Sequence, residues 1–497
     1  MKKKWFLALA LGGLMACQPQ QAELQLIQLD TIQLDKTALK VEVLADSLNV
    51  PWDLDVDSEG FLWIAEQEGK VSRINLQTGE KKLLLQIEEV WKVRTSGLLG
   101  MVAHPDFHRN PFLYLNYTFK KDSLIRSKLV RYTFKDYSLR DPKVLMEIEG
   151  GTSHNGSRLA FGPDGKLYWA TGDKHDFTYA QNPEKPNGKI LRLNPDGSIP
   201  SDNPDPKSPV WALGFRNMQG LAFSSSGLLY TSEHGDAIED EVNLIQKSGN
   251  YGWPAIEGKH DLQAELEFAD QYKTLEPINS WTPVIAPAGM TFYGSDAIPD
   301  WKNTLLLTTL KGKSLRILFL SSDGLRIDSE EILFENLYGR LRDVAIGPDG
   351  AVYLSTSNQD WNPQPGFPLP GDDKILKISP AKTISSNPII PVKASQVLAL
   401  DGKQLYQNYC ASCHKEDGKG VEGIFPSLVK SPLVQGEPRV LIEILLQGKS
   451  SATGAQAMPA FSFLDNREAA EILTYIRASW GNAASSISST QIESTRE

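Results

Sequence analysis

Two thiols and an imidazole lie close together near the C-terminal end of the sequence, in Cys410-Ala411-Ser412-Cys413-His414. Cysteines at this spacing can form thioether bonds to the two vinyl groups of a haem. The adjacent histidine can then take one axial position on the iron. The motif therefore predicts covalent haem attachment at Cys410 and Cys413, with His414 as an iron ligand, and electron transfer as the chemistry.

A Cys-x-x-Cys pair can also be a redox dithiol or half of a zinc site. The sequence has no second cysteine pair to complete a zinc site, which favours haem. Met458 lies 44 residues after His414, as the second axial ligand does in small class I cytochromes c, which this segment resembles. The alternative for Met458 is an ordinary core side chain. We expect an all-α cytochrome c domain over residues 399–482 and a flexible tail over residues 483–497.

Polar clusters of a second kind lie in the first three quarters of the chain, where loops are expected. They contain one histidine and several cations, which in a chain of net charge −10 indicate an anionic ligand with several carboxylates. The alternative is that each arginine pairs with a nearby acid. The clusters are His154-Asn155-Gly156-Ser157-Arg158, Gly214-Phe215-Arg216-Asn217-Met218-Gln219, Leu310-Lys311-Gly312 and Arg340-Leu341-Arg342-Asp343.

A repeat of about 60 residues must position these clusters. Four segments share an apolar residue, a short polar stretch with glycine and an apolar-aromatic pair, and their glycines are 105, 62 and 123 residues apart. Two degenerate copies, at residues 112–115 and 305–307, fall in the longer gaps. Six units in about 360 residues predict a six-bladed β-propeller, in which each copy is a turn followed by an inner strand. A β-sandwich is the alternative. The glycines are Gly60, Gly165, Gly227 and Gly350.

The N-terminal sequence predicts a lipoprotein signal peptide. Lys2, Lys3 and Lys4 precede an apolar run that ends in Leu14-Met15-Ala16-Cys17, and this run is too short to span a bilayer. We expect a signal peptide at residues 1–16, lipidation of Cys17, a tether at residues 17–39, the propeller at residues 40–381 and a linker at residues 382–398. Such a chain would be anchored to the cell envelope, on the periplasmic or outer-membrane side.

Composition supports more than one folded unit. The 497 residues are 41% hydrophobic and 23% charged, which is enough apolar material for two cores. The negative net charge makes nucleic acid an improbable partner.

Several longer motifs resemble the soluble quinoprotein glucose dehydrogenase family, which includes aldose sugar dehydrogenases and glucose/sorbosone dehydrogenases. The resemblance covers about residues 40–380. It implies a six-bladed propeller that holds pyrroloquinoline quinone (PQQ) and calcium. The motifs are Gly97-Leu98-Leu99-Gly100, His104-Pro105-Asp106-Phe107, the His154 and Gly214 clusters, Asp240-Glu241-Val242-Asn243-Leu244 and Gly249-Asn250-Tyr251-Gly252-Trp253-Pro254.

The resemblance assigns roles to matching residues. His154 would be the general base that takes the proton of the anomeric hydroxyl, although a histidine with only a structural role is the alternative. Arg216 would lie beside the quinone carbonyl and stabilise developing negative charge, and Asn217 would help to orient it. The side chains that would hold the carboxylates of the quinone are Lys311, Arg340 and Arg342.

The resemblance also implies two calcium positions. Main-chain oxygens of Gly235 and Asp236 match the loop that presents the calcium of the cofactor, and Glu241 and Tyr251 match a second, structural position. Two residues depart from the family pattern. Thr95 stands where glutamine or glutamate is usual, and Asp236 stands where proline is usual, so substrate preference and calcium geometry can differ in this chain.

The sequence therefore predicts a lipid-anchored quinohaemoprotein that oxidises an aldose, or a related hydroxy or aldehyde compound. Electrons would pass from the quinone to the fused haem, and then to a respiratory acceptor in or near the membrane. The rival interpretation is a non-catalytic binding propeller that carries an electron-transfer cytochrome.

Overall fold

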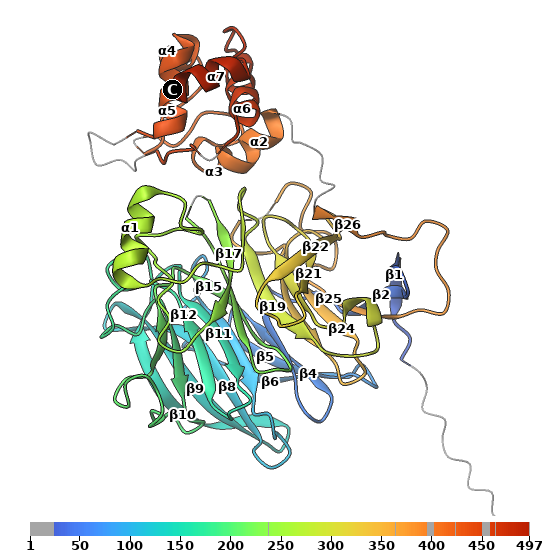
Figure 1. Cartoon of the computed structure of the whole chain (residues 1–497). Helices are drawn as coiled ribbons and strands as arrows, with labels where there is room; N and C mark the ends of the chain where they lie inside the picture. Colours follow the sequence, from blue (N-terminus) through green and yellow to red (C-terminus); the bar gives the residue numbers. More distant parts are fainter. Residues whose placement is uncertain are drawn as a thin grey trace, which may run out of the picture.

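Six antiparallel sheets surround one axis, and a small helical domain follows them in the chain (Figure 1). The computed structural model describes residues 24–394, 402–449 and 458–496, apart from residues 237, 363, 423 and 463. The predicted signal peptide, Cys17 and the first part of the tether lie outside the described residues. The fold is a six-bladed β-propeller followed by a helical C-terminal region, as the repeat and the haem motif predicted.

Blades one to four are sheets of four strands, taken in chain order from the axis outward. A helix, α1 (Gln263–Tyr272), lies between the last two strands of blade four. The strands are β3 (Pro51–Val56), β4 (Phe61–Glu66), β5 (Lys70–Asn75) and β6 (Lys81–Gln86); β7 (Leu98–Ala103), β8 (Phe112–Lys121), β9 (Leu124–Lys135) and β10 (Ser138–Glu149); β11 (Gly156–Phe161), β12 (Leu167–Thr171), β13 (Lys189–Leu193) and β14 (Val210–Leu213); β15 (Met218–Phe223), β16 (Leu229–Glu233), β17 (Asp240–Ile245) and β18 (Asn279–Trp281).

The last two sheets each contain five strands. Blade five receives an outer strand from the segment after the propeller, and blade six receives its two outer strands from the N-terminal end. Blade five contains β19 (Pro287–Tyr293), the 3₁₀ helix η1 (Pro299–Trp301), β20 (Thr304–Thr309), β21 (Leu315–Leu320), β22 (Ile327–Leu333) and β26 (Val392–Lys393); blade six contains β23 (Leu341–Ile346), β24 (Val352–Thr356), β25 (Ile375–Pro380), β2 (Ala38–Ala45) and β1 (Ile27–Gln33).

The sequence repeat marks the same hairpin in every blade. The four full copies span the turn from the first to the second strand, and the two degenerate copies lie within second strands. The second strands are β4, β8, β12, β16, β20 and β24. The first strands, not these, surround the axis, since the axial cavity is lined by β3, β7, β11, β15, β19 and β23. The repeat therefore gave the correct number of blades, but the strand that follows each turn is second from the axis rather than innermost.

The predicted tether is partly wrong, because β1 and the first two residues of β2 lie within residues 17–39, and the propeller uses both strands. β2 pairs with β25, where Val41 faces Ile378, and this pairing joins the two ends of the propeller chain. Ile32 and Leu39 are fully buried in the same cluster as Leu376. The alternating apolar residues of this segment have one buried face, so they form strands instead of a solvated spacer.

The helical domain packs around one apolar cluster that includes Leu405, Ile442 and Ile472. The predicted tail is also wrong, because α7 lies within it and Ile492 is fully buried in that cluster. The predicted linker contributes β26 to blade five, and its last residues lie outside the described part of the chain. The helices are α2 (Gly402–Tyr409), α3 (Ala411–His414), α4 (Pro432–Gln435), α5 (Pro438–Gln447), α6 (Asn466–Ala478) and α7 (Ser489–Arg496).

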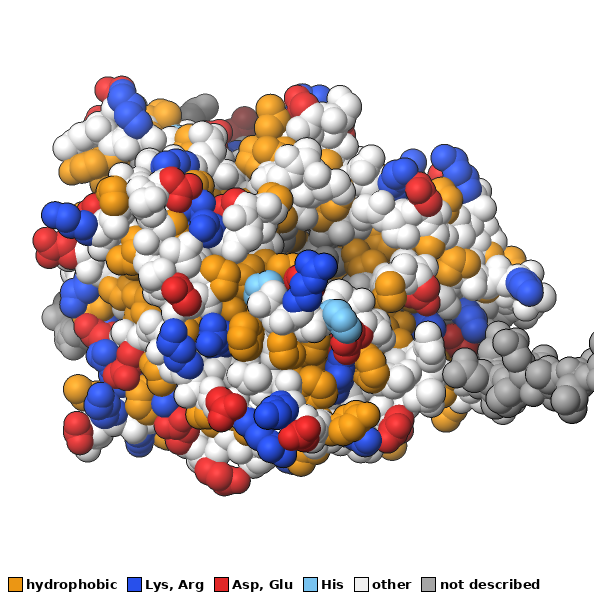
Figure 2. Space-filling view, turned by 90° about the horizontal axis from the view of Figure 1, so that it is seen from below, with side chains coloured by type: hydrophobic (Ala, Val, Ile, Leu, Met, Phe, Trp, Pro, Cys, Tyr) orange, Lys and Arg blue, Asp and Glu red, His pale blue; other side chains and the backbone are white. Residues whose placement is uncertain are grey.

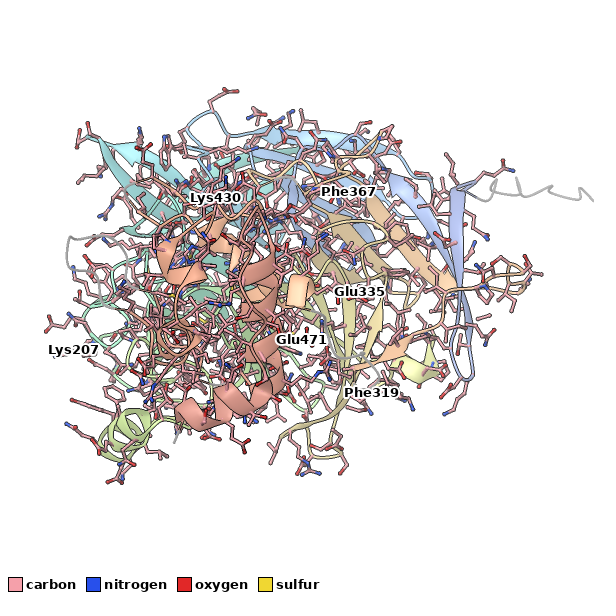
Figure 3. All side chains as sticks on the ribbon, turned by 90° about the horizontal axis from the view of Figure 1, so that it is seen from above. Lys207, Phe319, Glu335, Phe367, Lys430 and Glu471 are labelled. Carbon is pink, nitrogen blue, oxygen red and sulfur yellow. The ribbon has the colours of Figure 1, made fainter. Side chains whose placement is uncertain are left out.

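The helical domain lies over one end of the propeller rather than beside its rim (Figures 1 and 3). Seen from above, Lys430 and Glu471 of this domain project onto the ring of blades. The segment α2–α3, which carries the haem motif, is the part nearest the propeller (Figure 1). None of the described helices is long and apolar enough to span a membrane.

Candidate functional site

Strand direction brings the predicted site loops to one end of the propeller. In an antiparallel blade, the loop that enters the first strand and the loop that leaves the second strand lie at the same end. His154 precedes β11, Arg216 precedes β15 and Arg340 precedes β23, whereas Asp236 follows β16 and Lys311 follows β20. All five therefore share the end that the helical domain covers.

His154 is held by a carboxylate that the sequence analysis did not identify. Its Nδ1 lies 2.9 Å from Oδ1 of Asp173, and the exposed fraction of His154 is only 8%. Burial lowers the pKa of His154 to about 4, and the hydrogen bond to Asp173 opposes this effect. The imidazole is therefore neutral over the usual pH range, with Nδ1 committed to Asp173 and Nε2 available as the basic atom.

Asp173 is itself fixed by three donors. Besides His154, it accepts hydrogen bonds from the main-chain N–H of His175 and from Nε1 of Trp253, each at 2.9 Å. Burial alone raises the pKa of Asp173, but these hydrogen bonds outweigh burial and hold the pKa below its usual value. The chain approaches closely here, because a Cβ at Gly172 would lie 2.2 Å from the main-chain oxygen of His154. A glycine is thus required beside the histidine–aspartate pair.

A second imidazole packs on the first. The rings of His154 and His175 stack with their centroids 3.5 Å apart. Burial lowers the pKa of His175, and the nearby Arg216 charge adds to this effect. His175 is exposed, so it forms part of the accessible wall of the site.

Arg216 reaches the same region from blade four. Its Nη2 lies 2.6 Å from Oδ1 of Asp236, and its guanidinium lies 5.4 Å from the ring of Trp253. The Asp236 side chain is 45% exposed, so this ion pair opens to the interdomain space. Within the described part of the chain, Nε of Arg216 is buried and has no acceptor. An unsatisfied buried donor is costly, and a bound anion would remove that cost.

Asn217 joins two blades. Its Oδ1 accepts hydrogen bonds from the main-chain N–H of Gly156 at 3.2 Å and from Nε2 of Gln219 at 3.0 Å. Its own main-chain N–H donates to Glu233. Asn217 therefore fixes the loop that carries His154 relative to the strand that carries Arg216.

Arg340 and Arg342 share one acid. Nη2 of each binds Oδ2 of Asp360, at 3.0 Å for Arg340. Arg342 is 2% exposed, and its guanidinium stacks 3.7 Å from the ring of Trp52. Nε of Arg340 is buried without an acceptor among the described atoms. The predicted pairing of arginines with acids thus occurs, yet one carboxylate for two guanidinium groups leaves net positive charge.

The pKa of His234 responds to charged groups from several blades, which therefore lie close together. His234 is half-buried, and its Nε2 lies 2.8 Å from the main-chain oxygen of Pro287. Burial lowers the pKa of His234 to about 3, and the charges of Arg216, His154 and Arg342 lie close enough to contribute. Residues from blades three, four and six therefore surround one volume near the axis.

Lys311 completes the predicted cation set, but it points toward the helical domain. Its Nζ lies 2.6 Å from the main-chain oxygen of Asn408 in α2. Desolvation lowers the pKa of Lys311, and the nearby carboxylate of Asp240 opposes this effect. Lys311 therefore lies between the propeller site and the haem motif.

The calcium predictions stay predictions. Gly235 and Asp236 lie at the site end of the propeller, and the main-chain N–H of Gly235 donates to Asp240 at 3.0 Å. Glu241 is buried beside Gly258 and Asn243, and burial raises its pKa to about 7, whereas Tyr251 stacks on Phe215. Among the described residues, no three His, Cys, Asp or Glu side chains are grouped to hold a metal ion. The first predicted site relies on main-chain oxygens, and the second relies on the Glu241 carboxylate and a main-chain oxygen.

The residues of the haem motif lie at one short helical turn near the start of the helical domain. Cys410 is buried, Cys413 is half-buried, and both lie on one short helical turn with His414. Nδ1 of His414 lies 2.9 Å from the main-chain oxygen of Pro426, which leaves Nε2 for the iron. Met458 packs against the cluster that contains Cys410.

A cavity of about 630 Å³ opens at the opposite end of the axis (Figure 2). It is lined by the C-terminal ends of the first strands, so it is distinct from the loops described above. Arg158, which belongs to the predicted His154 cluster, points into this region and binds Asp53 at 2.7 Å and Asp343 at 2.9 Å. Arg158 is therefore a structural cation of the axis and not part of the candidate site.

The acids of the site were missed because their partners are distant in sequence. Asp173 follows the second strand of its blade directly in Thr171-Gly172-Asp173, and Asp360 follows β24 in Asn358-Gln359-Asp360. Both positions are loops at the end that also carries His154. Polar residues just after each second strand were the available signal, and the repeat had already located those strands.

Comparison with known proteins gives two matches along the chain. The profile of the family described as Glucose / Sorbosone dehydrogenase matches residues 48–362, and that of Cytochrome C oxidase, cbb3-type, subunit III, matches residues 398–476. Quinoprotein glucose dehydrogenase B of Acinetobacter calcoaceticus is 30% identical over 413 residues, covering 65% of this chain and 86% of that protein. Aldose sugar dehydrogenase YliI of Escherichia coli is 30% identical over 373 residues, covering 69% and 93%.

A solved structure supports the same relationship. The PQQ-bound form of an aldose sugar dehydrogenase from Streptomyces coelicolor superimposes with a TM-score of 0.60 at 32% identity, over 69% of this chain and 98% of that one. The unmatched part of this chain includes the helical domain with its haem motif. The chain therefore belongs to the glucose/sorbosone dehydrogenase family and carries a C-terminal cytochrome c domain.

Proposed function

We propose that this chain oxidises an aldose, or a related hydroxy or aldehyde compound, with PQQ and calcium, and that its own haem collects the electrons. The observation that carries this proposal is the neutral His154, held by Asp173 next to Arg216 at the covered end of the propeller. A binding module would not need a buried base with one nitrogen fixed and the other available. A second site, the haem motif, lies directly over this end (Figure 1).

The residues present fit a multiply charged quinone. Nε of Arg216 and Nε of Arg340 are buried donors for which the described residues offer no acceptor, and Lys311 lies at the rim. Carboxylates and carbonyls of a ligand would satisfy such donors. When bound, PQQ supplies an acceptor for a hydride equivalent. Arg340, Arg342 and Lys311 would hold its carboxylates, and Arg216 would face a carbonyl oxygen.

The chemistry assigned to the protein is proton transfer and charge stabilisation. Nε2 of His154 takes the proton of the substrate hydroxyl, and Asp173 keeps Nδ1 protonated and stabilises the imidazolium that forms. Arg216 provides fixed positive charge where negative charge develops. Main-chain oxygens of Gly235 and Asp236 would hold calcium next to the cofactor, and Glu241 with Tyr251 would hold a structural calcium.

The haem domain is the proposed first acceptor. Each oxidation of an aldose to its lactone releases two electrons and two protons, and a haem held by Cys410, Cys413 and His414 would supply a one-electron acceptor. Fusion keeps this acceptor at high effective concentration. A respiratory acceptor would then receive the electrons. We further propose that acylated Cys17 anchors the chain in the cell envelope, which metabolic labelling with a fatty acid would test.

Reconstitution tests the function. The purified haem-loaded chain is mixed with PQQ and calcium, and a panel of aldoses is added while the reduced haem band is recorded. Reduction by at least one sugar, only when quinone is present, is the expected result. If no sugar or alcohol reduces the haem, and an added dye is not reduced either, the binding-module interpretation replaces this proposal.

The pH dependence of sugar oxidation should show an acid limb near pH 4. Burial lowers the pKa of His154 to about 4, so the neutral base is present above this pH and is lost as pH falls through it. An unperturbed imidazole would instead give a limb near 6.5. The measurement is kcat/KM with a dye acceptor from pH 3.5 to 8, with reduction of the haem by a chemical reductant followed in the same buffers. A limb at about 6.5 would contradict the assigned base.

Replacing Asp236 with asparagine should tighten quinone binding by about two- to fivefold. The Asp236 carboxylate neutralises Arg216 at 2.6 Å and also repels an incoming anion, and partly exposed charge pairs contribute less than about 1 kcal/mol. Calorimetric titration of the quinone at fixed calcium measures the effect. Asp270→Asn is the control, because Asp270 pairs with Lys273 at the surface of α1. An affinity equal to that of the control would show that Asp236 does not compete for Arg216.

A further inference from the structure

One propeller side chain makes a direct bond to the segment that attaches the haem. Nζ of Lys311 donates to the main-chain oxygen of Asn408 at 2.6 Å. Asn408 lies in the last turn of α2, two residues before Cys410. Lys311 also acts electrostatically on Cys410 itself. The contact therefore joins the quinone end of the propeller to the beginning of the haem motif.

The loop that presents Lys311 is rigidly attached to the propeller. Main-chain N–H groups of Leu310, Lys311 and Gly312 donate to oxygens of residues 285 and 286 at 2.8 to 3.0 Å. Asp240 in turn accepts hydrogen bonds from the N–H groups of Ala286, at 2.6 Å, and Gly235, at 3.0 Å. Lys311 therefore projects from a fixed platform that also includes the loop of Gly235.

The end of α2 is a suitable receptor for this cation. The last carbonyl groups of a helix lack partners within the helix, and they carry partial negative charge. A lysine from another part of the chain can bind them as a C-terminal cap. An ammonium group has three donors, so one bond to Asn408 leaves two for a carboxylate of the quinone.

We propose that residues 310–312 are the docking site of the haem-attachment segment, and that Lys311 is the residue that couples the two domains. The bridging of Lys311 to a quinone carboxylate rests on the proposed function, whereas docking does not. The haem motif is thus held at the mouth of the propeller by a charged bond to α2. In this arrangement Lys311 is a positioning residue for electron transfer.

The test uses the full chain with haem attached and with neither quinone nor sugar. Lys311→Met should lower the reduction potential of the haem, because a nearby positive charge favours the reduced form. It should also speed hydrogen exchange in residues 404–414 by about tenfold, the factor expected for loss of a hydrogen bond from a charged donor. Lys311→Arg keeps the charge and should leave both quantities near those of the native chain.

Lys313→Met is the matched control. It removes the same charge two residues away, on a residue whose main-chain oxygen binds Asn336 within the propeller. We expect neither a lower potential nor faster exchange for this variant. If Lys311→Met equals Lys313→Met in both measurements, the docking proposal is overturned. No sugar or quinone is used in this test, so the shifts in haem potential and hydrogen exchange are expected even if the chain is not a dehydrogenase. Conversely, dye-linked sugar oxidation by the native chain is expected even if the docking proposal is wrong.

Discussion

Replacing His154 with alanine should slow sugar-dependent reduction of the haem by about 10²- to 10⁴-fold, the usual contribution of a positioned general base. The pKa of His154 is lowered to about 4, so the native side chain is a neutral base at pH 7, and alanine has no atom that can take the substrate proton. The measurement is stopped-flow absorbance at the reduced haem band, with saturating quinone, calcium and aldose. The loss should appear in kcat, because the base acts in the chemical step.

Two controls separate catalysis from folding. His108→Ala removes an imidazole whose side chain is 85% exposed at the opposite end of the propeller, and it should retain the native rate. Reduction of the haem by a chemical reductant should be equally fast in the native chain and in both variants. A His154→Ala chain that reduces its haem with sugar within about threefold of the native rate would eliminate His154 as the base.

The propeller could be predicted because its signal is local. Each copy of the repeat lies within one hairpin, and a turn such as Pro163-Asp164-Gly165 fixes the connection between the two strands. The strand pairing that closes the ring joins segments that are distant in sequence. β2 pairs with β25, so Val41 and Ile378 are neighbours although more than 300 residues separate them, and no pattern within residues 27–45 identifies that partner.

The same distinction explains the candidate site. His154, Arg216 and Arg342 were predicted because their motifs are contiguous and resemble a known family. Asp173 and Asp360 were not, because their role depends on which loops meet at one end of the propeller. The hydrogen bond between Lys311 and Asn408 joins two domains, so it cannot be predicted from the sequence of either domain alone.

Arg158 was grouped with the site residues because of its motif, but it lies outside the site. It belongs to the same contiguous cluster as His154, yet alternate residues of a strand point to opposite sides, and Arg158 lies in β11 rather than in the loop before it. Its ion pairs with Asp53 and Asp343 place one cation between two buried carboxylates at the axis. Membership of a motif therefore predicted proximity to the site, but strand geometry decided which side chains reach it.

The double substitution Cys410→Ala and Cys413→Ala should abolish covalent haem attachment completely, because the thioether bonds require both sulfur atoms. Haem staining after denaturing electrophoresis measures this directly, and the purified chain should lack the haem band. Sugar oxidation with a dye acceptor should stay within about twofold of the native rate, because His154, Asp173 and Arg216 all belong to the propeller.

The helical domain should also lose stability in this double variant, since a group bound only by the folded state stabilises that state. Cys410 belongs to the apolar cluster that holds α2, α5 and α6 together, so the haem would share that core. A separate thermal transition of the helical domain should therefore shift to lower temperature while the propeller transition stays unchanged. Cys17→Ala serves as the thiol control and should keep its haem. Haem that stays bound to the double variant through denaturing electrophoresis would contradict attachment at Cys410 and Cys413. Loss of dye-linked oxidation together with the haem would contradict the assignment of sugar oxidation to the propeller and of electron transfer to the helical domain.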